Sequence, residues 1–136
     1  MRLYMLDTDT VSHLVRGRNP TLDSRVATVA PKHLCISAVT RGELLYGLRL
    51  KDGAPRLPQL IDQFLLRLQC LPWDEAAATH FASIAADLHK AGTPIGSMDA
   101  MIAGHAMAAR AVLVTHNGRH FSRVVGLTVE DWCRER

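Results

Sequence analysis

Short apolar runs alternate along this chain with longer stretches in which apolar residues recur every three or four positions. Residues 3–6, 34–36 and 111–114 form the continuous apolar runs. Their length predicts β-strands, and the lack of polar positions inside them is typical of a parallel sheet that is buried on both faces.

The longer stretches predict amphipathic helices, because a spacing of three or four residues places apolar side chains on one helix face. A first helix begins near Thr8 and ends within residues 17–20, where Gly and Pro occur, and Ser37 is a candidate cap of the next helix. Residues 51–55 are expected to form a flexible break between helices. The further helices are expected over residues 38–50, 57–68, 74–90 and 99–110. Strands that alternate with helices predict an α/β fold, in one domain over residues 1–136.

The first predicted strand ends abruptly in Asp7 and Asp9. In an open α/β sheet ligands bind beyond the carboxyl ends of the strands, so acids at this point face the active-site crevice. Asp9 is interpreted as a cap of the helix that follows. Asp7, directly after the buried run, is the candidate for chemistry.

Two more acids, each on a predicted helix, and a polar pair after a strand are further candidates. Glu43 lies beside the apolar stripe of the helix that follows the second strand, where a solvated side chain is the alternative. Asp99 lies in the first turn of its helix, where the helix dipole alone would favour an acid. Thr115 and Asn117 follow the strand at residues 111–114. We expect these side chains to converge with Asp7.

Converging carboxylates predict a hard divalent cation, because Mg²⁺ and Mn²⁺ bind carboxylates, waters and substrate phosphates. Such an ion lowers the pKa of bound water and stabilises charge during hydrolysis of a phosphodiester. The competing interpretation is a zinc site at His116 and His120, four residues apart. That site is rejected because the glutamate of a metalloprotease helix is missing and Asn117-Gly118 favours a turn.

Charge and composition set limits on the class of protein. The chain has 136 residues, 48% of them hydrophobic, which allows an ordinary core without disulfides or structural metal. A net charge of +3 and a pI near 9.0 are compatible with a polyanionic partner. Arg119 and Arg123 are candidate phosphate contacts, with pairing to Glu130 or Asp131 as the alternative.

The cysteines and the length of the apolar runs predict the cellular location. Three widely spaced cysteines fit free thiols in a reducing cytoplasm. The apolar runs are too short to span a membrane, and no secretory leader is recognised, so a cytoplasmic protein is expected.

Four ordered segments together resemble the PIN domain, specifically the VapC-type toxins of bacterial toxin–antitoxin modules. The segments are Tyr4–Asp9, Ile36–Leu44, Gly92–Ala106 and Val114–Asn117. The resemblance covers nearly the whole chain. It implies a three-layer α/β/α fold with a central parallel sheet, Mg²⁺-dependent endoribonuclease activity with Mn²⁺ as a substitute, a homodimer, and neutralisation by a VapB-like antitoxin.

The motif match also assigns roles to residues. Asp7, Glu43 and Asp99 occupy the metal-binding acidic positions, and Thr115 matches a hydroxyl residue of the site. Asn117 stands where many PIN domains have a fourth aspartate, which favours one-metal chemistry, and Asp9 would partly restore the lost charge. The segment before Asp99 resembles members that cut initiator tRNA in the anticodon stem-loop.

Two other functions remain open from the residues alone. Asp7-Thr8-Asp9-Thr10-Val11 also matches the opening motif of haloacid-dehalogenase-like phosphatases, with Asp7 as nucleophile, although their lysine and late acidic pair are not found. A noncatalytic RNA-binding module could use the same crevice. The helices at 57–68 and 74–90 offer more apolar surface than a small sheet needs, so one of them is expected at a dimer seam or antitoxin groove.

Overall fold

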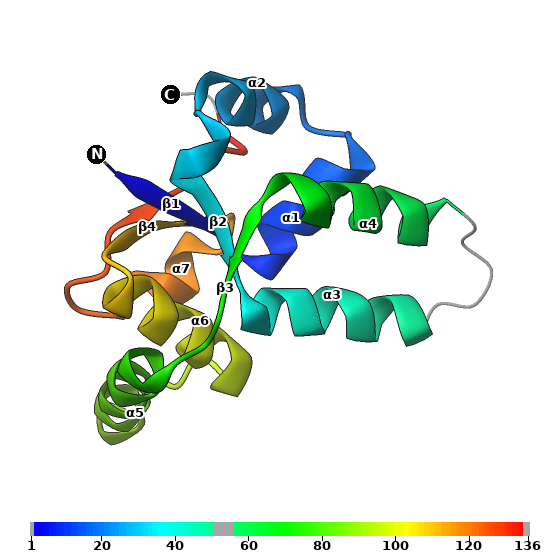
Figure 1. Cartoon of the computed structure of the whole chain (residues 1–136). Coiled ribbons are helices and arrows are strands. Elements are labelled where there is room, and N and C mark those ends of the chain that lie inside the picture. Colours follow the sequence, from blue (N-terminus) through cyan, green and yellow to red (C-terminus); the bar gives the residue numbers. More distant parts are fainter. Residues whose placement is uncertain (1, 51–55, 135–136) are drawn as a thin grey trace.

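The centre of the molecule is a five-stranded parallel sheet (Figure 1). The computed structural model describes residues 2–50 and 56–134. The strands are β1 (Leu3–Leu6), β2 (Leu34–Ser37), β3 (Gln69–Leu71), β4 (Ala111–Val114) and β5 (Val129–Glu130), in the order β3-β2-β1-β4-β5. The predicted loop at residues 51–55 lies outside the described residues.

Helices cover both faces of the sheet, which confirms the predicted three-layer α/β/α fold. The first face carries α1 (Thr8–Arg16), α2 (Pro20–Thr28), α3 (Ala38–Leu50) and α4 (Leu57–Arg67), and the second carries α5 (Glu75–Lys90), α6 (Ser97–Ala108) and the short α7 (Gly118–Phe121). A 3₁₀ turn at Pro31–His33 precedes β2. Figure 1 shows α3 and α4 extending together on the side opposite α5 and α6.

Successive side chains of the buried strands supply two separate cores. Met5 packs among side chains of α5 and α6, whereas Leu6 packs against α1, α2, α3 and α4. This alternation follows from the two-residue period of a strand. It explains why the strands read as continuous apolar runs, since a sheet covered on both faces has no polar face.

The strand order changes direction at β1, because β2 lies on one side of it and β4 on the other. Leu6 is paired with Val114, and the backbone N–H of Asp7 donates to the Val114 carbonyl at 3.0 Å. Asp7 and Thr115 therefore leave neighbouring strands at the same edge of the sheet. This edge, at the point where strand order reverses, is where open α/β sheets bind ligands.

Two helices of the second face, α5 and α6, pack unusually closely. Gly104 of α6 faces the backbone of α5, where a Cβ added to Gly104 would lie 2.6 Å from the Phe81 nitrogen. The Trp73 indole also donates to the carbonyl oxygen of Met101 in α6 at 3.0 Å. These contacts fix α6, whose first turn contains Asp99.

Most predicted elements are confirmed, and two helix starts behave as expected. Ser37 Oγ accepts from the N–H of Val39 at 3.1 Å, and Asp74 is the N-cap of α5. The assignment of Asp9 as the cap of α1 is wrong. Asp7 is the N-cap and accepts from the Thr10 N–H, while Asp9 is an exposed residue of the first turn. Within the described residues, no helix is long and apolar enough to cross a membrane.

Candidate active site

Asp7 is a buried carboxylate held in place by two hydrogen bonds. Its exposed fraction is 4%, and its Oδ1 accepts from the Thr10 N–H at 2.8 Å while its Oδ2 accepts from the Thr115 hydroxyl at 2.5 Å. The Asn117 N–H in turn donates to the Thr115 oxygen at 2.9 Å. Burial raises the pKa of Asp7; the hydrogen bonds from Thr115 and Thr10 lower it, and the charge of Asp9 adds to the increase.

Glu43 reaches the same region from the flank of α3. The Thr8 hydroxyl, in the first turn of α1, donates to Glu43 Oε1 at 2.6 Å and lies 3.2 Å from the Thr40 hydroxyl. Glu43 is half-buried. Its side chain is thus held by α1, which argues against the alternative of a freely solvated helix glutamate.

Asp99 enters from the second face of the sheet. It lies in the first turn of α6, after Gly96 at a φ of 93°, a conformation that suits glycine. Asp99 Oδ2 lies 3.3 Å from His120 Nδ1 of α7. Asp99 is half-buried. Because it contacts His120, its position is set by a side-chain contact in addition to the helix dipole.

These residues line one open cavity of about 590 Å³ at the carboxyl edge of the sheet. Its lining consists of Asp7, Thr8, Asp9, Ser12, Glu43, Asp99, His116 and Asn117. Four of the eight are carboxylates, and neither lysine nor arginine is among them. Asp7, Glu43, Asp99 and Asn117 are thus brought together as expected, with Thr115 behind them in contact with Asp7; their chemical roles stay predictions.

The donor set of this cavity fits a hard divalent cation. Carboxylate and amide oxygens are the ligands that Mg²⁺ and Mn²⁺ prefer. Among the described residues, the ligand atoms of Asp7, Glu43 and Asp99 do not all lie within 4.8 Å of one another. An ion bound directly by one or two of these carboxylates would reach the others through water, which is the usual coordination of Mg²⁺.

The two candidate RNA-binding arginines lie outside the cavity lining. Arg119 is exposed on α7, and Arg123 points to another part of the surface, 3.4 Å from the Pro94 carbonyl oxygen. The alternative that they pair with Glu130 or Asp131 is wrong. Glu130 pairs with Arg2 and Arg25, and Asp131 pairs with His116 and Arg134.

Sequence reasoning missed three residues of the cavity: Thr8, Ser12 and His116. Thr8 and Ser12 are four residues apart and share one face of α1, a signal that was present in the sequence. No sequence pattern placed His116 at the cavity, because the residue that it contacts, Asp131, is distant in the sequence. His116 and His120 contact different carboxylates, so they do not form the zinc pair that was rejected above.

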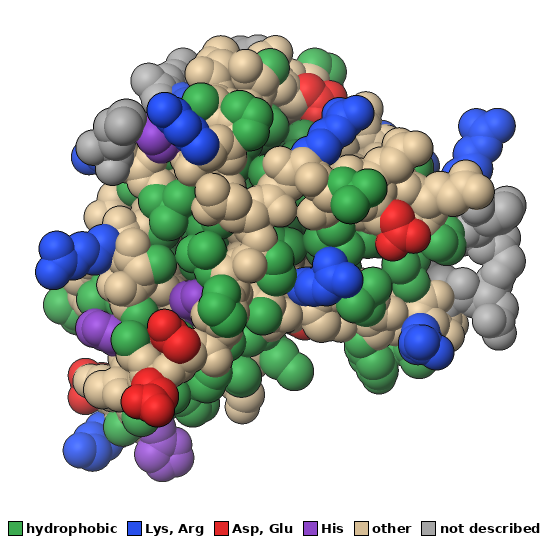
Figure 2. All heavy atoms as spheres, viewed as in Figure 1, with side chains coloured by type: hydrophobic (Ala, Val, Ile, Leu, Met, Phe, Trp, Pro, Cys, Tyr) green, Lys and Arg blue, Asp and Glu red, His purple; other side chains and the backbone are tan. Residues whose placement is uncertain are grey.

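An apolar groove between α1, α3 and α4 adjoins the acidic cavity. Its lining includes Val15, Leu44, Gly47, Leu48, Leu57 and Ile61. Thr8, Ser12 and Glu43 line both the groove and the cavity, so the two are continuous. Figure 2 shows hydrophobic side chains exposed over α3 and α4, among separate basic side chains.

Comparison with known proteins assigns this arrangement to a family. The model of the PIN domain matches residues 4–127. The chain is 38% identical to the tRNA(fMet)-specific endonuclease VapC of Salmonella typhimurium, over 98% of this chain and all of the relative. It is 39% identical to the protein of the same name from Shigella flexneri, with 97% and 99% covered.

Solved structures give the same result for the fold. The DNA-bound VapBC crystal structure from Salmonella typhimurium has a TM-score of 0.91 at 38% identity, covering 98% of this chain and 100% of that one. VapBC-1 from nontypeable Haemophilus influenzae has a TM-score of 0.86 at 32% identity, covering 97% and 99%. The chain belongs to the PIN-domain family and, within it, to the VapC ribonucleases.

Proposed function

We propose that this chain is a Mg²⁺-dependent endoribonuclease toxin that cleaves initiator tRNA in the anticodon stem-loop, in the cytoplasm. The observation that carries the proposal is the acidic cavity at the strand-order reversal, which among the described residues is lined by four carboxylates and by no lysine or arginine. PIN-domain nucleases in general depend on divalent metal ions. The relatives named for tRNA(fMet) support the choice of RNA.

In this proposal Asp7, Glu43 and Asp99 hold Mg²⁺, directly or through water, and Mn²⁺ can substitute. When bound, the ion supplies an activated water and stabilises negative charge on the phosphate. Each Asp7 oxygen keeps a lone pair beyond its hydrogen bond, so the contacts from Thr10 and Thr115 orient the carboxylate without blocking it. Such supporting contacts fix the direction of a ligand.

Thr115 and Asn117 act beside these acids. Thr115 is buried and positions Asp7, and its oxygen also holds the backbone of Asn117. The exposed Asn117 side chain is then available to orient a water or the scissile phosphate. Asn117 adds no charge, which favours one-metal chemistry.

RNA would be held by exposed basic side chains outside the cavity. Arg119 lies on α7, whose His120 contacts Asp99, so a phosphate bound to Arg119 would lie on the element next to the acids. Arg123 is the second candidate, further from them. Such contacts position the RNA backbone without reading its sequence.

A VapB-like antitoxin would occupy the apolar groove between α1, α3 and α4. The groove is lined by five aliphatic side chains, by Gly47 and Arg16, and by the polar residues Thr8, Ser12 and Glu43, and it continues into the acidic cavity at Glu43. A partner helix could therefore bury apolar side chains in the groove and place a basic side chain among the carboxylates. The VapBC complexes to which the chain is similar support this pairing. A homodimer of the toxin is proposed as well.

The test is cleavage of initiator tRNA by the purified chain, with the 5′ ends of the fragments sequenced. Chelation should abolish cleavage, Mg²⁺ or Mn²⁺ should restore it, and Asp99→Asn should lose it while remaining folded. Cleavage that persists in chelator would overturn the metal proposal.

Two further readouts separate the other functions. A phosphatase would instead hydrolyse a small phosphomonoester and form a phosphoaspartate at Asp7, and an RNA-binding module would bind RNA without producing fragments. The family assignment argues against the phosphatase, because the haloacid-dehalogenase motif covers only the residues around Asp7 whereas the PIN-domain model covers residues 4–127.

A further inference from the structure

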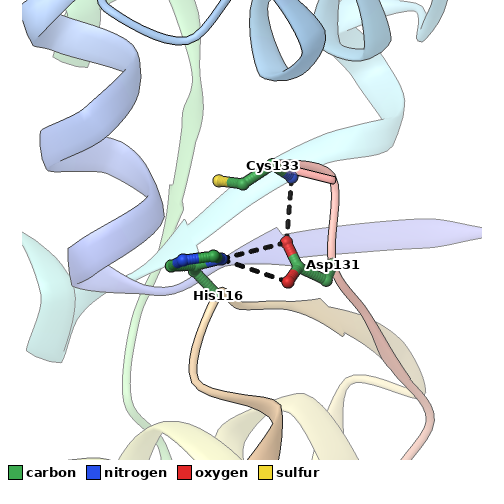
Figure 3. Close-up of side chains that lie close together, drawn as sticks. All are labelled: His116, Asp131 and Cys133. Atoms are coloured by element: carbon green, nitrogen blue, oxygen red, sulfur yellow. Dashed lines mark hydrogen bonds and ion pairs between the residues drawn. The ribbon is translucent and has the colours of Figure 1, made fainter. Parts of the chain in front are cut away.

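Three side chains with different ligand atoms meet at the edge of the acidic cavity. His116 follows β4, and Asp131 and Cys133 follow β5 (Figure 3). Each offers one ligand atom, and these atoms all lie within 4.8 Å of one another. His116 Nδ1 is 3.1 Å from Asp131 Oδ2, and the Cys133 N–H donates to Asp131 Oδ1 at 2.9 Å.

The backbone that carries two of these groups is firmly anchored. Trp132, between Asp131 and Cys133, is only 1% exposed; its ring lies 5.0 Å from that of Tyr4 and 5.1 Å from the Arg25 guanidinium carbon. Figure 3 shows Asp131 and Cys133 beside the His116 ring. Little ordering of the backbone would be needed for the three groups to bind one ion, which favours binding.

We propose that His116, Asp131 and Cys133 bind a thiophilic divalent cation, with Zn²⁺ as the best fit. Imidazole, carboxylate and thiolate are all zinc ligands, whereas Mg²⁺ and Ca²⁺ prefer oxygen alone. The site is therefore chemically distinct from the carboxylates proposed to hold Mg²⁺, and it does not depend on ribonuclease activity.

The spacing of the three ligand atoms allows them to bind one zinc ion together. Zinc bond lengths place two ligand atoms roughly 3.4–3.6 Å apart. The three ligand atoms lie within 4.8 Å of one another, so side-chain rotations would bring them to that spacing. On binding, Cys133 forms its S–Zn bond as the thiol proton passes to solvent. Water would fill the fourth position, or His13, whose ring centroid lies 5.8 Å from that of His116.

The local charge favours a cation. Burial, followed by the charges of Asp131, Asp9 and Asp7, raises the pKa of the Cys133 thiol to about 11, and the same negative charges attract a cation to the sulfur. Arg134 makes a contact of 3.4 Å with Asp131, but its side chain is mostly exposed and can turn away. The competing interpretation is that the His116–Asp131 contact only ties the C-terminal segment to the end of β4. It predicts no uptake of metal.

Cobalt is the probe, because a thiolate bound to Co²⁺ gives a charge-transfer band in the near ultraviolet. The full chain should show this band with one Co²⁺, and Zn²⁺ should displace it. Cys133→Ser should lose the band and Cys70→Ser, a change at an exposed cysteine of β3, should keep it. His116→Asn, at an exposed position, should weaken Co²⁺ binding on the order of tenfold or more.

A second readout separates this site from the Mg²⁺ site. Zn²⁺ should raise the melting temperature of the wild-type chain and of Asp7→Asn, but not that of Cys133→Ser. The proposal is overturned by a wild-type chain without the thiolate band, by an equal band in Cys133→Ser, or by a Zn²⁺ response that Asp7→Asn alone removes. These outcomes are independent of whether RNA is cleaved.

Discussion

At the scale of single residues, Asp7 combines a structural role with the proposed chemical one. It caps α1 through Thr10 and is also the most buried acid of the cavity. Burial disfavours its charged form, so the metal-free cavity is electrostatically costly to the fold. This cost can be measured separately from catalysis.

Asp7→Asn should abolish RNA cleavage and yet stabilise the metal-free protein at pH 7. Burial raises the pKa of folded Asp7 above its ordinary value of 3.8, so ionised Asp7 destabilises the fold at neutral pH. That cost disappears as the pH falls through the raised pKa, and the advantage of Asn should shrink with it. Thermal melting in chelator across this pH range is the measurement, with the exposed Asp62→Asn as control. A lower melting temperature than wild type at pH 7 would contradict the argument.

Thr115→Val should slow cleavage about 10- to 100-fold, the usual cost of losing a residue that orients a metal ligand. Valine has nearly the shape of threonine but leaves Asp7 Oδ2 without its hydroxyl donor and the Asn117 N–H without its acceptor. Thr115→Ser should keep most of the rate because the hydroxyl is retained. Single-turnover cleavage under saturating Mg²⁺ measures the effect, and equal rates for Val and Ser would refute it.

The sequence predicted which residues gather at the cavity better than it predicted their contacts. Asp7 could be placed there because it follows a strand, Asp99 because it lies in the first turn of a helix, and Glu43 because it lies beside the apolar stripe of α3. Which aspartate caps α1 depends on the residue at which the helix begins. The prediction for Asp9 is wrong because α1 begins at Thr8, directly after Asp7. The Thr8–Glu43 hydrogen bond joins two elements whose relative position no local pattern specifies.

At the scale of elements, the close packing of α5 on α6 depends on Gly104. An added Cβ would lie 2.6 Å and 2.8 Å from two backbone atoms of Phe81, which no side-chain rotation can relieve. Gly104→Ala should therefore destabilise the protein by about 1–3 kcal/mol, as overpacked cores do. Gly42→Ala, where nothing lies within 4 Å, should instead stabilise it by up to about 1 kcal/mol. Urea unfolding compares them, and equal midpoints would argue against the tight contact.

Arg119 tests how α7 contributes to RNA binding. Arg119 is exposed, and within the described part of the chain no salt bridge involves it. Arg119→Ala should weaken RNA binding, and the slope of log affinity against log salt should become shallower by about one unit at most. Binding is measured in an Asp99→Asn background, where RNA stays intact, with Arg67→Ala as control. An unchanged slope together with a lower melting temperature would assign Arg119 a purely structural role.

Helices and strands with a clear apolar pattern were predicted from the sequence. Among the elements that were not, α2 begins within a segment that contains Gly and Pro, and β3 and β5 are very short. The sequence pattern places the end of the first helix within residues 17–20, although Asn19 caps α2 and Pro20 opens it. This combination is itself a helix-start signal. β3 and β5 span three and two residues, too few to show a period, and only pairing with β2 and β4 defines them.

At the scale of the whole molecule, the acidic cavity and the apolar groove form one continuous surface through Thr8, Ser12 and Glu43. The sequence suggested that the helix at 57–68 or at 74–90 would supply such a groove. The structure distinguishes them, because Leu57 and Ile61 of α4 line the groove whereas α5 is packed against α6. Which helix lines the groove depends on the face of the sheet that each helix covers, and the apolar pattern alone did not specify this face.

Gly47→Leu should block binding of the VapB-like antitoxin by filling this groove. Gly47 lines the groove, and an added Cβ meets nothing within 4 Å, so a side chain can begin at this position without a backbone clash. The leucine would occupy the space that apolar partner side chains need, and affinity should fall at least tenfold, about 1.4 kcal/mol. Gly42→Leu on the same helix, also without a neighbour within 4 Å but outside the groove lining, is the matched control. Titration calorimetry with the purified antitoxin, in the inactive Asp99→Asn background, measures both. If both variants bind as tightly as the parent, the antitoxin does not occupy the groove between α1, α3 and α4.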